Sequence, residues 1–193
     1  MGNAIHDNKA TIILLVKGHY IGDVANQISL TACISGGRML KKIISGGQSG
    51  ADQAGLDAAI KNNLAHGGAI PKGRLTEDGI LPEKYNLDEM TSKSYPKRTE
   101  KNILDSDGTA IFTHGKLTGG SLLTRKKGVE HNKPVVHINL SKLGAEEAAL
   151  ELNIFIRSNN IEVLNVAGSR ASKDDQIYGA VFQLIDSTIE MNR

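Results

Sequence analysis

Short apolar segments alternate with amphipathic segments from about residue 39 to the end of this chain. The apolar segments have the length and β-branched content of buried strands, and they are residues 42–45, 65–70, 109–113, 135–139 and 162–166. The amphipathic segments carry apolar residues on one helical face, and they are residues 51–62, 96–106, 121–132, 145–158 and 173–190. Strands that alternate with helices through tight connections pair in parallel by right-handed crossovers. The sequence therefore predicts an α/β fold, a three-layer, doubly wound, mainly parallel and Rossmann-like sheet.

The chain of 193 residues is long enough for one good hydrophobic core, and we expect two unequal parts. Residues 39–193 form the single Rossmann-like domain of this prediction, because the alternating pattern starts at Met39. Residues 1–38 are expected to be a poorly ordered N-terminal extension or leader. Their apolar run, residues 10–16, is too short to span a membrane, and an extra edge strand is an alternative for it. We expect a cytoplasmic protein without a membrane partner.

The composition argues against several function classes. Lys and Arg total 23 against 21 Asp and Glu, so the formal net charge is +2 and no basic excess is present to bind nucleic acid. A single cysteine and 6 histidines without ligand spacing predict no metal held by protein side chains. No Gly-x-Ser-x-Gly motif supports a serine hydrolase. We assign no catalytic residue and favour a binding protein over an enzyme.

The strongest local motif is a glycine-rich loop between the first predicted strand and the helix that follows it. Glycine permits positive φ and leaves no Cβ in the way of an anion, while the helix N-terminus offers unpaired N–H groups. We expect the loop to bind a phosphate or a related oxyanion, and a branched side chain at Gly47 to occupy the phosphate position. The alternative is a tight turn whose glycines serve packing alone. The candidate contacts are Gly46, Gly47, Gln48, Ser49, Gly50, Ala51 and Asp52.

A second glycine-rich loop, residues 115–121, also follows a predicted strand and precedes a predicted helix. Two such corners in one sheet can bracket a single ligand at the point where the strand order reverses. A packing turn is again the alternative. The candidate contacts of this second corner are Thr118, Gly119, Gly120, Ser121 and Thr124.

Cationic and amide side chains in two further segments complete the candidate site. Lys72 and Arg74, with Gly73 between them, can pair with a phosphate, and the guanidinium does so with two parallel hydrogen bonds. Arg98 and Asn102 stand one turn apart on the same predicted helix. Each of these side chains has a solvated surface position as its alternative.

A series of motifs in a fixed order resembles the molybdenum carrier family, a circularly permuted, YpsA-like branch of the SLOG nucleotide-binding superfamily. The resemblance covers about residues 41–190. It departs at Ala69 and Ile70, where the family more often has Trp and Cys. The matching motifs are residues 44–52, 66–74, 77–79, 98–102, 105–107, 117–121, 133–137 and 164–172.

The resemblance implies a binding or carrier protein for molybdenum cofactor or for a related phosphorylated ligand such as a nucleotide phosphate, and it implies a homo-oligomer. Direct binding of molybdate is a close variant of this expectation. Molybdenum would then arrive already chelated by its pterin, in agreement with the absence of a predicted protein metal site.

Two alternatives stay open. The first is a nucleotide-processing enzyme, a phosphoribohydrolase that uses Glu77, Glu100 or Asp105 as its acid or base. Relatives with that activity carry a catalytic Glu soon after the glycines of the second corner, and this chain has no acid there before Glu130. The second alternative is a nucleotide sensor of the SLOG type.

Overall fold

The computed structural model describes residues 39–192. Its central sheet is parallel throughout, in the spatial order β2 (Ala65–Gly67), β1 (Lys42–Ser45), β9 (Val163–Gly168), β7 (Gly108–Thr113) and β8 (Val135–Asn139). The helices are α2 (Ala51–Lys61), α3 (Tyr95–Leu104), α4 (Gly119–Glu130), α5 (Ala145–Ser158) and α6 (Ile177–Met191). This arrangement confirms the predicted α/β fold class. The expectations for residues 1–38 lie outside the described part of the chain.

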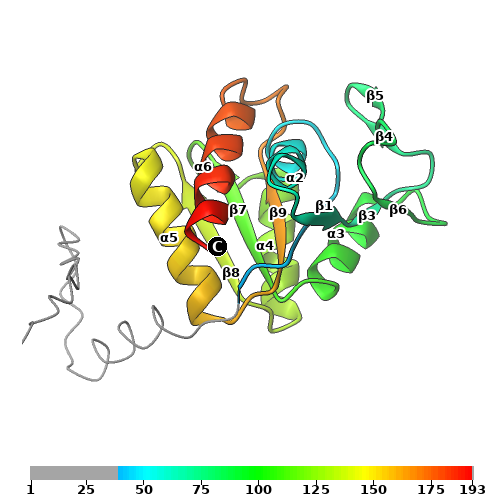
Figure 1. The fold of residues 1–193 in the computed structure, drawn as a ribbon. Helices are drawn as coiled ribbons and strands as arrows, with labels where there is room; N and C mark the ends of the chain where they lie inside the picture. Colours follow the sequence, from blue (N-terminus) through cyan, green and yellow to red (C-terminus); the bar gives the residue numbers. More distant parts are fainter. Residues whose placement is uncertain (1–38, 193) are drawn as a thin grey trace, which may run out of the picture.

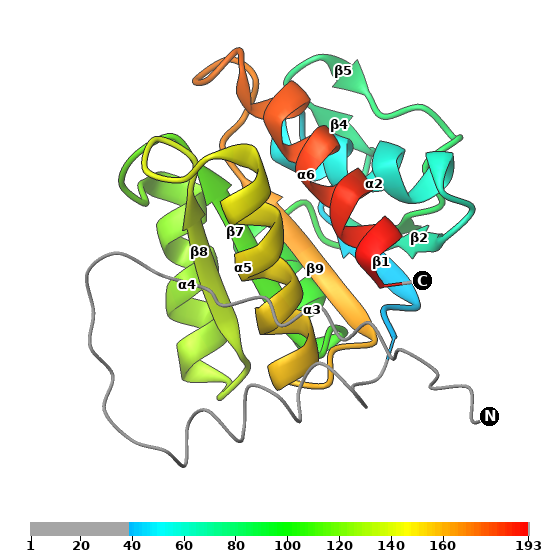
Figure 2. The ribbon, with the colours of Figure 1, turned by 60° about the vertical axis from the view of Figure 1, so that its left-hand side comes forward.

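Helices cover both faces of the sheet and so complete three layers (Figure 1). Helix α6 packs between α2 and α5 on one face, and α4 lies on the opposite face beside α3 (Figure 2). The core under α2, α5 and α6 includes the fully buried side chains of Phe112, Ile138, Leu164, Leu152 and Ile156. Within residues 39–192, no helix is both long and apolar enough to cross a membrane.

The last strand of the chain, β9, lies between β1 and β7 and pairs with both. Lys42 is in register with Val163 on one side, and Gly108 is in register with Leu164 on the other. From β1 the chain continues outward to β2, and from β7 it continues outward in the opposite direction to β8. The strand order therefore reverses at β9, and the carboxyl ends of β1, β9 and β7 meet at one edge of the sheet.

The predicted strand at residues 65–70 is interrupted at Gly68, where the expectation of one continuous strand was wrong. Gly68 has φ of 122°, and a Cβ there would stand 2.1 Å from the carbonyl oxygen of Ser45. Only glycine permits this turn and this close approach. After it, β3 (Ala69–Ile70) leaves the main sheet and pairs with β6 (Asp88–Glu89).

Residues 71–94, between β3 and α3, pack against one side of α2, and we call them the cover segment. It contains a small antiparallel hairpin of β4 (Leu75–Thr76) and β5 (Gly79–Ile80), and its apolar residues Leu81 and Leu87 are buried against Leu56. Helix α6 starts later than the predicted range of 173–190, because residues 170–174 form turns closed by bonds to the carbonyl of Arg170.

Replacement of Phe112 by Ala tests the core between the sheet and α5 and α6. We expect Phe112→Ala to lower the free energy of unfolding by about 3–5 kcal/mol, because it removes a fully buried ring and leaves a cavity. Chemical denaturation measures this change. Ile80→Ala is the control, since Ile80 is 73% exposed and its truncation should cost less than about 0.5 kcal/mol. Equal losses in the two variants would contradict the assignment of the core.

Candidate functional site

Both predicted glycine corners lie at the same edge of the sheet, because β1 and β7 are parallel neighbours of β9. The loop that follows β9 runs between them. The Ala51 N–H at the start of α2 donates to the Ser169 carbonyl at 3.1 Å, and the Ser169 N–H donates to the Phe112 carbonyl of β7 at 3.0 Å. The structure thus brings the corners together but places backbone, rather than an open crevice, directly between them.

The first corner is largely closed by the chain itself, because the N–H groups of its central residues, 47–49, already have acceptors. The Gly47 N–H donates to Ser45 Oγ at 3.1 Å, and the Ser49 N–H donates to the side-chain oxygen of Gln48 at 3.3 Å. The buried carboxylate of Asp52 accepts from the Gln48 N–H at 3.3 Å. Burial raises the pKa of Asp52, against the lowering effect of Arg98 and of the loop amides.

The glycines of the first corner leave room for neighbouring side chains of the protein. A Cβ at Gly46 would stand 1.3 Å from Nη1 of Arg98, whose guanidinium lies across the loop. A Cβ at Gly47 would stand 2.7 Å from Leu81 and 2.9 Å from Leu87. A branched side chain at Gly47 would therefore disturb the packing of these leucines, and its effect on a ligand stays a prediction.

Arg74, predicted as a phosphate ligand, has a structural role in the cover segment. Its guanidinium donates to the carbonyls of Leu87 and Tyr85, each at 3.0 Å, and to those of Leu81 and Pro82 at longer range. These bonds hold residues 81–87, which follow the hairpin, in a closed loop around the guanidinium. The neighbouring Lys72 and Gly73 are exposed on the outside of the same segment.

Three other predicted contacts, on α3 and α4, are also engaged within the chain. The Asn102 amide brackets Ala69, accepting from its N–H at 2.7 Å and donating to its carbonyl at 3.2 Å. Thr124 Oγ1 donates to the Gly120 carbonyl at 2.9 Å. Arg98 forms an ion pair with Asp52 at 3.4 Å, and its buried Nε has no partner among residues 39–192.

The second corner is open. The Ser121 hydroxyl bonds back to the residue that precedes α4, accepting from the Thr118 N–H at 3.1 Å and donating to the Thr118 carbonyl at 2.7 Å. No acceptor within residues 39–192 faces the N–H groups of Gly119 or Gly120. A Cβ at Gly120 would have no neighbour within 4 Å, and the Lys173 ammonium stands 4.0 Å from the Cβ position of Gly119. Exposed amides at a helix N-terminus beside a cation suit an anion.

A cleft of about 570 Å³ lies beside this corner, at the carboxyl ends of β7 and β8. Three cationic side chains, Lys116, Arg125 and Lys142, line it with one acid, Glu151. Burial and the charges of Arg125 and Lys142 lower the pKa of His137, which also lines the cleft. The cleft has the size of a small-molecule site. The sequence analysis did not assign the three cations of this cleft to a site. One signal was available, because His137 and Asn139 alternate along the predicted strand at residues 135–139 and so lie on the same face of the sheet.

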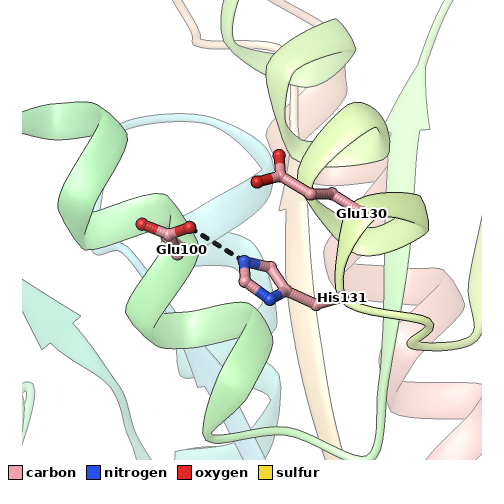
Figure 3. A group of neighbouring side chains, drawn as sticks. All are labelled: Glu100, Glu130 and His131. Atoms are coloured by element: carbon pink, nitrogen blue, oxygen red, sulfur yellow. Dashed lines mark hydrogen bonds and ion pairs between the residues drawn. The ribbon is translucent and has the colours of Figure 1, made fainter.

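Glu100, Glu130 and His131 gather where α3 faces the end of α4 (Figure 3), and one ligand-type atom of each lies within 4.8 Å of the others. The Glu100 carboxylate bonds to His131 at 2.8 Å and to Lys127 at 3.0 Å, and Lys127 also pairs with Glu130 at 3.0 Å. Because Lys127 pairs with both carboxylates, the group forms an ion-pair network that joins the two helices. The Glu100 carboxylate is thus a structural link between α3 and α4 in this conformation.

A doubly wound parallel sheet whose strand order reverses at β9 defines a Rossmann-like fold. The chain belongs to the circularly permutated YpsA SLOG family, whose sequence profile matches residues 43–189. It is also similar to a solved structure from Syntrophus aciditrophicus described as a putative molybdenum carrier protein, with 49% sequence identity and a TM-score of 0.78. That similarity covers 81% of this chain and 98% of the other. A comparison with curated proteins gave no match. The family resemblance predicted from the sequence is confirmed.

The ion-pair network predicts a pH dependence of stability. Hydrogen bonds from His131 and then Lys127 lower the pKa of Glu100 below its ordinary value of 4.5. The stabilisation is therefore present above about pH 4.5 and is lost as the pH falls through the lowered pKa. We expect Glu100→Gln to lower the melting temperature at pH 7 and the difference from wild type to shrink in acid. Glu83→Gln, at an exposed acid of the cover segment, is the control; a difference that persists in acid would contradict this assignment.

Proposed function

We propose that this protein is a carrier that binds an anionic, molybdenum-containing ligand, either phosphorylated molybdenum cofactor or molybdate, at the second corner. The observation that supports it most is the pair of exposed amides at Gly119 and Gly120, with Lys173 beside them. The adjoining cleft adds cationic side chains and the apolar surfaces of Leu117, Leu122 and Leu143. The name of the Syntrophus relative supports the same class of ligand.

This proposal uses the predicted contacts selectively. Thr118, Gly119, Gly120 and Ser121 form the anion-binding end, and Lys116 and Arg125 extend it into the cleft. In the conformation described, the residues of the first corner bond within the chain and would support the site without contacting the ligand. Oxygen atoms of the ligand would accept hydrogen bonds from the amides, and molybdenum would keep its own ligands, so the protein would hold its cargo without a direct bond to the metal.

Gly120→Val tests the site. Valine has a helix propensity close to that of glycine, and no neighbour lies within 4 Å, so the fold should persist while a branched side chain covers the amides. A hydrogen bond to a charged group contributes about 1.5–3 kcal/mol, so we expect affinity for molybdate to fall by roughly 10- to 100-fold. Isothermal titration calorimetry measures it.

Gly179→Val is the matched control for this substitution, because Gly179 is also an exposed helical glycine without a neighbour within 4 Å. Its affinity should equal that of the wild type. Native mass spectrometry of freshly purified protein, which detects a co-purifying small molecule, identifies the cargo. Unchanged molybdate and phosphate affinity in Gly120→Val would overturn the assignment of the site.

We also propose that the protein forms a homo-oligomer, as the family resemblance implies. Light scattering after size-exclusion chromatography checks this assembly. A mass that is a multiple of the 20.6 kDa chain is expected, and a mass of 20.6 kDa at all concentrations would contradict it.

A further inference from the structure

We propose that Ser49, just before α2, and Ser172, after β9, form a second oxyanion subsite, which the chain blocks with its own Glu77 carboxylate and which takes a phosphate or molybdate when Glu77 leaves. This inference deepens the proposed function and rests on it for the class of ligand. It concerns the first corner, where the N–H groups of residues 47–49 already have acceptors. The donors that matter here are side-chain hydroxyls and an amide from the loop after β9.

The Glu77 carboxylate is bound as an incoming anion would be. One of its oxygens accepts from Ser49 Oγ and from the Ser172 N–H at 3.0 Å, and the other accepts from Ser172 Oγ at 2.6 Å. The positive charge of Arg170 acts on the same carboxylate. Two hydroxyls, an amide and a nearby guanidinium are the donor types that bind phosphate in proteins.

Glu77 arrives from outside the core, on the turn between β4 and β5. The hairpin buries little apolar surface, since Leu75 is 50% exposed and Ile80 is 73% exposed. Its tip is tied down by the carboxylate and by the Glu77 N–H, which donates to the Gln48 side chain at 2.8 Å. The base of the segment has a separate anchor in the bonds of Arg74. The tip can therefore lift while the rest of the cover stays in place.

The arrangement relates the two corners to each other. Strands two places apart in a sheet are roughly 10 Å apart, which is the distance expected between the ends of β1 and β7. A ligand with one anionic group would fill the second corner and leave Glu77 in place. A ligand with a second anionic group at that distance, or a second free oxyanion, would displace it.

Calorimetric titration with molybdate and with inorganic phosphate, on the full chain, tests the proposal. The variants are Glu77→Ala and its control Asp78→Asn, which removes the same charge from an exposed neighbour on the same turn. Both are also made in the Gly120→Val background, which isolates the first corner. If Glu77 blocks the subsite about nine-tenths of the time, its removal should tighten oxyanion binding about tenfold, and Asp78→Asn should change it less than about twofold. Amide hydrogen exchange at residues 76–80 should be faster in Glu77→Ala than in the wild type, and it should be unchanged in Asp78→Asn.

The outcomes separate this proposal from the proposed function. Tighter binding in Glu77→Ala that persists in the Gly120→Val background supports the blocked subsite, even if wild-type binding proves insensitive to Gly120→Val and the proposed function fails. Unchanged or weaker binding in Glu77→Ala overturns the blocked subsite and leaves the second corner to stand on its own test. An equal gain in Asp78→Asn also overturns it, because a general charge effect would then be the cause.

Discussion

The parallel pairing of β9 with β1 on one side and with β7 on the other is the constraint on which the binding edge depends. It sets the two glycine corners on either side of one strand, and it leads the chain after Gly168 directly between them. A Cβ at Gly168 would stand 2.2 Å from the Phe112 carbonyl and 2.7 Å from Ala51, so this passage requires a residue without a side chain. The Ser169 backbone then connects α2 to β7 through its two hydrogen bonds.

The two glycine-rich corners lie in different environments. The glycines of the first corner accommodate Arg98, leucine side chains and backbone, and the N–H groups of residues 47–49 bond within the chain. At the second corner, only the Lys173 ammonium comes within 4.0 Å of a Cβ position at Gly119, nothing within residues 39–192 does so at Gly120, and no acceptor there takes their N–H groups. The difference arises from what the chain brings to each loop. The cover segment reaches the first corner, whereas the second has α4 and the cationic cleft beside it.

Local periodicity was sufficient for most of the fold. The predicted segments 42–45, 135–139 and 145–158 match β1, β8 and α5 at both ends, because each has an uninterrupted apolar pattern. The break at Gly68 was not visible, since it depends on a carbonyl of another strand. For the site, parallel topology alone placed both corners on one edge. The engagement of Arg74 by four carbonyls, and that of Asn102 by Ala69, depends on tertiary contacts that no local pattern encodes.

The accessibility of Gly119 and Gly120 has a kinetic consequence for cargo held there. No described segment folds over these residues, so loading and unloading would not wait for a lid to open, and the residence time would depend on the strength of the contacts alone. A receiving protein could approach the bound anion from the solvent side and take it by direct competition. If the protein is the carrier that we propose, such a direct transfer would not have to wait for spontaneous dissociation of the ligand.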